Sequence, residues 1–174
     1  KVIAVANQKG GVGKTTTSIN LSSCVAYRNR KVLLIDLDPQ GNTTTGLGID
    51  KKNMELSIYD VIINDTPLAE ATISTIQENL FICPSSMKLA GAEVELVSLL
   101  SRELRLKNAI DDVKDQYDYI FIDCPPSLGL LTLNALTGSD TVLVPIQCEY
   151  YALEGLSQVL KTVNLVQKKL NPAL

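Results

Sequence analysis

One stretch decides the fold of this chain: Lys9-Gly10-Gly11-Val12-Gly13-Lys14-Thr15-Thr16. It follows a short apolar run, Val2–Ala6, and it precedes a helical pattern from about Thr15 to Tyr27. A glycine-rich turn between a strand and a helix is the setting of a phosphate-binding loop, or P-loop. Glycines let backbone amides curl around a phosphate without clashes from β-carbons, and the helix N-terminus adds its positive dipole end. We therefore expect this stretch to bind phosphate.

The P-loop also carries the side chains that a bound nucleotide needs. Lys14 would place a mobile positive charge on the β and γ phosphates, and Thr15 would offer Mg²⁺ a hydroxyl ligand. The common pattern G-x-x-x-x-G-K-[ST] requires glycine at position 8. This chain has Gln8 there and an additional lysine, Lys9, at the start of the loop. The pattern therefore predicts a P-loop of an unusual subclass.

Aspartates follow two further apolar runs. Asp123 ends the run Tyr119–Asp123, a position typical of a carboxylate that holds Mg²⁺ directly or through water. Its structural alternative is a helix cap or a turn. Asp36 and Asp38 stand where a second run meets Pro39, and for Asp38 the structural alternative is an Asx turn. The role of Asp36 stays open.

Short apolar runs alternate with helical patterns along the whole chain. Strands are expected at 2–6, 31–36, 79–83, 119–123 and 141–146, and a loop at 38–50. Helices are expected at 15–27, 57–64, 128–136 and in the last 20 or so residues, with one or two helices broken near Ser101 within 88–116. Runs that are continuously hydrophobic are typical of buried parallel strands. The pattern predicts an α/β fold in three layers, with a mostly parallel, doubly wound sheet flanked by helices.

Composition excludes several functions. The chain has 174 residues and no histidine, so imidazole cannot serve as a base or a metal ligand. Its net charge of −3 does not indicate a basic nucleic-acid binder. Cysteines 24, 83, 124 and 148 form no CxxC pair, and we expect buried, reduced thiols, with Cys124 a packed residue rather than a nucleophile. No apolar run approaches the ~18 residues of a membrane helix. We expect one domain over 1–174, from a longer protein.

The P-loop resembles the deviant Walker A motif of the ParA/MinD/nitrogenase-iron-protein class of P-loop ATPases. In that class the first lysine reaches across a dimer to the partner's nucleotide, and Lys9 occupies its position. The resemblance implies that ATP is held by Lys9, Gly10, Gly11, Val12, Gly13, Lys14, Thr15 and Thr16. It implies catalytic roles for Lys9, Lys14 and Asp38, with Asp38 orienting the attacking water from switch I. Mg²⁺ would be held by Thr15 and, through water, by Asp123 at the start of switch II.

The segments 36–42, 123–129 and 151–156 resemble the chromosomal ParA (Soj) branch. This resemblance implies a cytoplasmic, nucleoid-associated ATPase for DNA segregation, in which ATP builds a homodimer that binds DNA without sequence preference. A ParB-type partner would trigger hydrolysis, and most of the DNA-binding surface would lie beyond Leu174. The alternative is a MinD-like membrane-associated ATPase that positions cell division. A metabolite kinase and a nucleotide-gated scaffold are further alternatives, and chromosomal or plasmid cargo is left open.

Overall fold

A single sheet forms the centre of the computed structural model, which describes residues 1–148 and 152–174. Within this part of the chain, six strands are ordered β3-β4-β2-β5-β1-β6. All neighbours are parallel except β3, which runs antiparallel to β4 at one edge. The strands are β1 (Val2–Val5), β2 (Val32–Asp36), β3 (Ile73–Ser74), β4 (Leu80–Cys83), β5 (Tyr119–Asp123) and β6 (Thr141–Leu143). The mostly parallel, doubly wound sheet is therefore confirmed.

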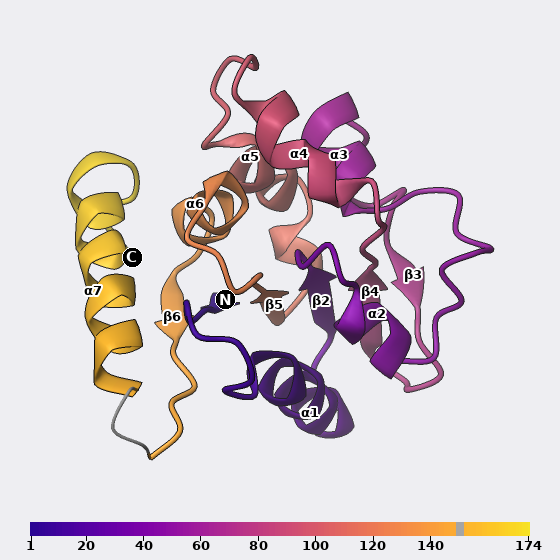
Figure 1. The fold of residues 1–174 in the computed structure, drawn as a ribbon. Helices are drawn as coiled ribbons and strands as arrows, with labels where there is room; N and C mark the ends of the chain where they lie inside the picture. Colours follow the sequence, from indigo (N-terminus) through magenta and orange to yellow (C-terminus); the bar gives the residue numbers. More distant parts are fainter. Residues whose placement is uncertain (149–151) are drawn as a thin grey trace.

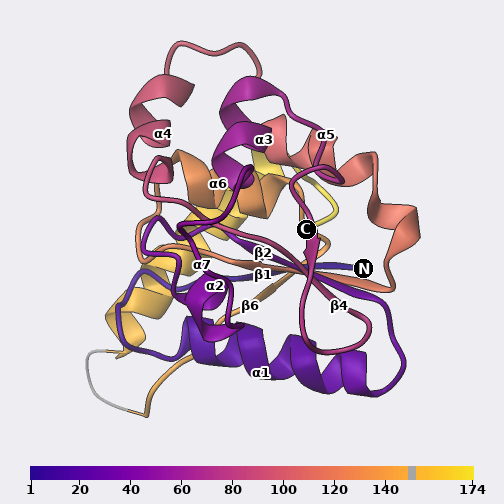
Figure 2. The ribbon, with the colours of Figure 1, turned by 90° about the vertical axis from the view of Figure 1, so that its right-hand side faces the viewer.

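Helices cover both faces of the sheet (Figures 1 and 2). On one face lies α1 (Lys14–Tyr27), with the short α2 (Asn42–Gly46) beside it. The other face carries α3 (Ile58–Asn64), α4 (Leu89–Leu96), α5 (Arg105–Asp111) and α6 (Leu130–Thr137). A 3₁₀ turn, Lys114–Gln116, lies between α5 and β5 in the sequence. The last helix, α7 (Ala152–Lys169), stands next to β6 and α6. This is the three-layer arrangement that the sequence predicts.

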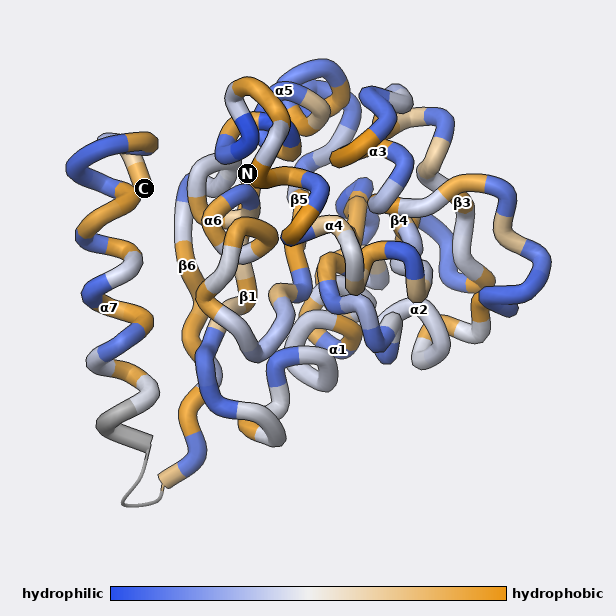
Figure 3. The backbone as a smooth tube through the Cα atoms, turned by 45° about the horizontal axis from the view of Figure 1, so that its top comes forward, coloured by the Kyte–Doolittle hydropathy of each residue, from blue (hydrophilic) through white to orange (hydrophobic). Residues whose placement is uncertain are grey.

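Strand β2 shows why the apolar runs are continuous. Successive side chains of a strand point to opposite faces, and both faces of this sheet are covered. Leu33 and Ile35 join the core under α3–α6, whereas Val32 and Leu34 pack with Ala26 of α1. The tube coloured by hydropathy accordingly shows hydrophobic strands inside a more polar periphery (Figure 3). None of the described helices is long and apolar enough to cross a membrane.

The structure differs from the predicted secondary structure at three places in the first two thirds of the chain. The expected loop at 38–50 contains the short helix α2. Thr43 and Thr44 of this helix donate hydrogen bonds to the carboxylates of Asp123 in β5 and Asp36 in β2, and these long-range bonds hold the helix in place. The edge strand β3 has no counterpart in the prediction, since two residues carry no periodic signal. The helical stretch 88–116 is broken over 97–104, not only near Ser101, whose φ of 51° lies in the left-handed region.

The C-terminal part differs in smaller ways. Strand β6 ends at Leu143, because its pairing with β1 ends where β1 does, at Val5. The apolar stripe of α7 packs on the core through Val163, Val166 and Leu170. Val159 is also buried, while Leu160 is half exposed. Figure 3 shows the corresponding alternation of hydrophobic and hydrophilic segments along α7. Residue 151 and the side chains of 152–154, which belong to the quoted segment 151–156, lie outside the described part of the chain.

The cysteine prediction is half right. All four cysteines are free thiols, and Cys83 and Cys124 are buried as expected. Cys24 and Cys148 are exposed, because the first lies on the outer face of α1 and the second in the loop after β6. Burial raises the pKa of the Cys124 thiol far above its ordinary value, so this thiol is inert, as a packed residue should be.

Candidate nucleotide-binding site

Three loops meet at one edge of the sheet because neighbouring parallel strands end there. The P-loop follows β1, the segment 37–41 follows β2, and the segment 124–129 follows β5. In the register of the sheet, Asp123 of β5 lies opposite both Val5 of β1 and Asp36 of β2. The order β2-β5-β1 therefore brings together residues that are 80 or more positions apart in the sequence. Ligands of open α/β sheets bind at this edge.

The P-loop is open on its concave side. Gly11 and Gly13 have φ values of 75° and 88°, which favour glycine, and Gly13 is the N-cap of α1. A β-carbon added at Gly10, Gly11 or Gly13 would meet no atom within 4 Å. The loop is thus a cradle of backbone around empty space, with the N-terminus of a 14-residue helix behind it. This geometry suits a phosphate.

Lys14 lies inside this cradle. It is only 7% exposed, and its Nζ donates a hydrogen bond to the carbonyl of Lys9 at 3.0 Å. Burial lowers the pKa of Lys14, and the nearby carboxylates of Asp123 and Asp38 act in the opposite direction. A phosphate would offer this ammonium group a charged acceptor in place of the carbonyl.

Lys9 lies at the mouth of the same loop. Its backbone amide donates to Oδ1 of Asn7 at 3.1 Å, and its side chain is partly buried. A β-carbon at Gly155, near the start of α7, would stand 3.7 Å from Cβ of Lys9. The start of α7 therefore borders the lysine that the resemblance places at a dimer face.

Asp123 is the centre of the site. Its Oδ2 accepts hydrogen bonds from the hydroxyls of Thr15 at 2.9 Å and Thr43 at 2.7 Å, and its Oδ1 lies 3.0 Å from the hydroxyl of Ser18. Burial raises the pKa of Asp123, while the three hydroxyls act to lower it. The carboxylate thus ties β5 to α1 and to α2.

The donor set fits Mg²⁺. This cation prefers oxygen ligands, and it is usually held by one or two protein groups together with substrate phosphates. Thr15 and Asp123 bring a hydroxyl and a carboxylate into contact beside the cradle. No cluster of three or more acidic or cysteine side chains that could hold a metal by itself occurs among the described residues. A cation at this place would depend on a phosphate ligand.

Asp36 and Asp38 have different surroundings. Asp36 is fully buried, and its carboxylate accepts from the amide of Asp38 and from both the amide and the hydroxyl of Thr44. Burial raises the pKa of Asp36 to about 6. Asp38 forms the Asx turn that was its structural alternative, with Oδ1 accepting from the amide of Gln40 at 2.9 Å. The same carboxylate nevertheless borders the open space next to the P-loop.

A pocket of about 380 Å³ lies between these loops. Its walls come from the P-loop, from the segment after β2 and from the segment after β5. The lining residues are Gly10, Gly11, Gly13, Lys14, Thr15, Thr16, Asp38, Gln40, Asn42 and Pro126. Val12 is buried and does not line it. The structure therefore brings six of the eight predicted phosphate-binding residues, all but Lys9 and Val12, to one pocket with Asp38. Asp123 lies next to Thr15.

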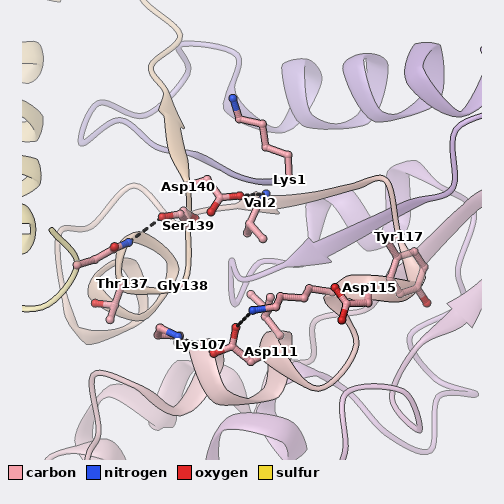
Figure 4. A pocket seen from close by; sticks show the side chains of 13 residues that line it. Lys1, Val2, Lys107, Asp111, Asp115, Tyr117, Thr137, Gly138, Ser139 and Asp140 are labelled. Atoms are coloured by element: carbon pink, nitrogen blue, oxygen red, sulfur yellow. Dashed lines mark hydrogen bonds and ion pairs between the residues drawn. The ribbon is translucent and has the colours of Figure 1, made fainter. Parts of the chain in front are cut away.

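A second pocket of about 440 Å³ lies at the opposite edge of the sheet, where β1, β5 and β6 begin (Figure 4). Asp111 accepts from Lys107 and Lys114 there, and Asp140 accepts from the backbone amide of Val2. Because three aspartates line this pocket together with its lysines, and no P-loop residue lines it, this pocket is a weaker candidate for a nucleotide site than the first.

Sequence reasoning missed three hydroxyl residues of the site. Ser18, Thr43 and Thr44 hold the carboxylates of Asp123 and Asp36. Ser18 could have been found, because it stands four residues after Lys14 and therefore on the same face of α1. Thr43 and Thr44 lie in a run of three threonines, and only the tertiary structure distinguishes the two that face inward.

This combination of a parallel sheet, a P-loop after its first strand and an aspartate at the end of a neighbouring strand defines a P-loop nucleotide-binding protein. The family model described as AAA domain matches residues 1–174. The sporulation initiation inhibitor protein Soj of Bacillus subtilis (strain 168) is 61% identical over 174 residues, which is all of this chain and 69% of Soj. The chain therefore belongs to the AAA domain family, in its ParA/Soj branch of P-loop ATPases.

Other relatives agree with this assignment. The chromosome partitioning protein ParA of Myxococcus xanthus (strain DK1622) is 54% identical over the whole chain, which spans 62% of that protein. The chain thus covers about two thirds of the length of these relatives. Among solved structures, cobyrinic acid a,c-diamide synthase from Mycobacterium smegmatis, with bound ATP analog and magnesium, has a TM-score of 0.95 and 44% identity. That match covers 100% of this chain and 71% of the synthase.

Proposed function

We propose that this chain is the ATP-binding and ATP-hydrolysing part of a ParA/Soj-type partition ATPase that uses Mg²⁺. One observation carries the proposal: the carboxylate of Asp123 joins Thr15 of the P-loop to Thr43 of the segment after β2, beside an open phosphate cradle. A nucleotide bound in the cradle would therefore affect both the P-loop and the segment after β2, because Asp123 connects them. The likeness to Soj and to an ATP-analog and magnesium complex supports ATP as the ligand.

The roles of the residues follow from their positions. Residues 9–16 bind the phosphates through backbone amides, and Lys14 neutralises the β and γ phosphates. Thr15 and, through water, Asp123 would hold Mg²⁺, which would supply positive charge next to the transferred phosphoryl group. Asp38 orients the attacking water from the side of the pocket facing the P-loop. No arginine lines this pocket in the described part of the chain, so we expect slow hydrolysis without a partner.

The rest of the cycle rests on the same family membership. We expect ATP to bring two chains face to face, with Lys9 of each reaching the nucleotide of the other. The dimer would bind DNA without sequence preference, mostly through the part that relatives carry beyond the matched region. A ParB-type activator would complete the geometry of the attacking water and release the dimer. The protein would accordingly act in the cytoplasm, on the nucleoid.

The deciding experiment uses Asp38→Ala in the full-length protein. This variant should bind ATP and dimerise but release phosphate at least tenfold more slowly than the wild type, so it should accumulate the ATP state. Its binding to non-specific duplex DNA is measured with ATP and with ADP, at low and high salt. We expect binding that requires ATP and falls steeply with salt, because phosphate contacts release counterions.

Two outcomes would contradict the proposal. Unchanged phosphate release by Asp38→Ala would remove Asp38 from the hydrolytic step. An absence of DNA binding in every condition would favour the MinD-like alternative, for which ATP-dependent binding to liposomes is the next measurement. Transfer of the phosphoryl group to a small acceptor instead of water would indicate a metabolite kinase.

A further inference from the structure

Gln147 lies in the segment that follows β6, outside the motifs of the nucleotide site. Its Nε2 donates a hydrogen bond to the carbonyl of Gly11 at 3.0 Å, across 136 residues of sequence. The carbonyls of Lys9 and Gly13 are held from within the P-loop and α1, the first by the ammonium group of Lys14 and the second by a backbone amide. Among the described residues, Gln147 is the only one outside the P-loop and α1 that donates to a P-loop carbonyl.

A buried side chain sets the position of this segment. Asn7, which follows β1, is only 3% exposed. Its Nδ2 donates to the carbonyl of Pro145 at 2.8 Å, and its Oδ1 accepts from the amide of Lys9 at 3.1 Å. Asn7 thus ties the first residue of the P-loop to the residue two positions before Gln147. The exposed side chain of Gln147 therefore extends from backbone that is held against the P-loop.

The hydrogen bond from Gln147 acts on the peptide group that joins Gly11 to Val12. In a planar trans peptide, the carbonyl and the following amide point in opposite directions. Gly11 has no β-carbon and a φ of 75°, so little steric resistance opposes a rotation of this peptide group. A bond to its carbonyl therefore decides where the amide of Val12 points. Gly11 and Gly13, on either side of Val12, both line the nucleotide pocket, whereas Gln147 does not, so the carbonyl is held on the outer side of the loop.

We propose that Gln147 is a positioning residue of the P-loop, which holds the carbonyl of Gly11 outward so that the amide of Val12 faces the phosphates. The backbone of a P-loop cradles the α and β phosphates, so the bond favours the binding of ATP and ADP alike. It acts equally on the bound substrate and on the transition state, and it therefore affects KM rather than kcat. This inference rests on the proposed ATP-binding function, and it adds the segment after β6 to the three segments that form the site.

The test measures the dissociation constants of ADP and of a non-hydrolysable ATP analog, each with Mg²⁺, by calorimetry on the full-length protein. Gln147→Ala removes the donor, and Gln147→Met removes it while keeping a side chain of similar length. Each should raise both dissociation constants about fivefold, which corresponds to the loss of one hydrogen bond. Gln158→Ala is the matched control, since Gln158 is an exposed glutamine of α7. It should bind both nucleotides as the wild type does.

Three further readouts separate positioning from a general structural role. In phosphate release, Gln147→Ala should raise KM for ATP about fivefold and leave kcat within about twofold, because KM reports binding where hydrolysis is slow. In ¹⁵N-labelled protein without nucleotide, Gln147→Met should shift the amide resonance of Val12, and Gln158→Ala should not. In the background of Asn7→Ala, which releases the segment after β6, the loss of affinity caused by Gln147→Ala should shrink to less than about twofold.

The inference and the proposed function fail in different ways. If the wild type binds both nucleotides and both variants at position 147 bind them with the same affinity, Gln147 has no positioning role. A loss confined to the ATP analog, or a lower kcat at unchanged KM, would place Gln147 in the hydrolytic step and would overturn the inference. A loss of affinity together with a lower thermal unfolding midpoint of the nucleotide-free protein would indicate a structural contact, with the same consequence. A wild-type protein that binds neither nucleotide would overturn the proposed function itself, and this inference with it.

Discussion

Asp36 and Asp123 end neighbouring strands, yet their hydrogen bonds separate their roles. Asp36 accepts from backbone amides of its own segment, so it holds residues 38–44 in shape. Among the described residues, Asp123 accepts only from side-chain hydroxyls, two in α1 and one in α2. Hydroxyls can turn toward a water or a cation, whereas amides fixed in a turn cannot. These hydrogen bonds favour the structural one of the two roles that the sequence left open for Asp36.

The raised pKa of Asp36 predicts a dependence of stability on pH. In the folded protein, Asp36 keeps its proton up to about pH 6, whereas in the unfolded chain it loses the proton near 3.8. The folded state binds more protons in this interval, so its stability falls as pH rises from about 4 to 6 and is level above. Asp36→Asn should remove this contribution, on the order of 3 kcal/mol. Urea unfolding of both proteins across this pH range, with EDTA, tests it; parallel curves would contradict it.

Lys14→Ala tests the P-loop assignment directly. Removing this buried charge should weaken ATP binding roughly 30-fold or more, because charge-assisted hydrogen bonds to the phosphates are lost. Isothermal titration calorimetry with ATP and Mg²⁺ measures the effect. Lys169→Ala, at an exposed lysine at the end of α7, is the control and should bind as the wild type does. Tight binding by Lys14→Ala would count against the P-loop.

At the scale of elements, the side chain of Asn134 in α6 fixes the irregular segment 97–104 between α4 and α5. Asn134 of α6 is fully buried, and its Nδ2 donates to the carbonyls of Arg102 and Leu130. Its Oδ1 accepts from the amide of Leu106 at the start of α5. One amide side chain thus pairs the carbonyl of Arg102 and the amide of Leu106 at the two ends of this connection. This is the reason that α4 and α5 are separate helices with a fixed connection.

Asn134→Ala should therefore lower the free energy of unfolding by about 2–4 kcal/mol, because it leaves buried backbone groups without partners. Chemical denaturation monitored by circular dichroism measures the loss. Asn108→Ala, at an exposed position of α5, is the control and should change stability by less than about 0.5 kcal/mol. Equal small effects of both variants would show that the contacts of Asn134 carry no net stabilisation.

At the scale of the whole molecule, the sheet edge that carries the P-loop also exposes the surface on which a second chain would lie. Gly10 is exposed there, and a β-carbon on it would meet nothing within the chain. Its conformation is not in the left-handed region. A side chain at this position is therefore compatible with the folded monomer. Because Gly10 also lines the nucleotide pocket, a dimerisation defect is assigned to the contact between chains only where ATP binding is retained.

Gly10→Val should fold normally but fail to dimerise with ATP, because the added side chain would stand between two chains that meet face to face. Analytical ultracentrifugation with ATP and Mg²⁺, in the background of Asp38→Ala, measures the dimer. Circular dichroism provides the control for folding. A variant that still forms the ATP-dependent dimer would contradict the face-to-face arrangement.

The sequence by itself determined the fold class, the P-loop and the aspartates at the ends of strands. A short sequence pattern predicts each of these: a run of apolar residues, a glycine-rich turn with lysine, or an acidic residue at the end of a strand. Local patterns predict local structure, so β1, α1, β2 and β5 are close to their expected bounds. Membership in the ParA/Soj branch rests on the same motifs, and the relatives confirm it.

Only the tertiary structure decided which polar side chains meet. Thr43 reaches Asp123 across 80 residues of sequence, and Ser18 reaches it across 105. Gln147 reaches Gly11 because β6 pairs with β1, so that the segments that follow these two strands lie side by side. Such contacts are set by strand order and register, which no short segment specifies. Helix α2 and the break at 97–104 have the same cause, since long-range hydrogen bonds outweigh the weak preferences of a few residues.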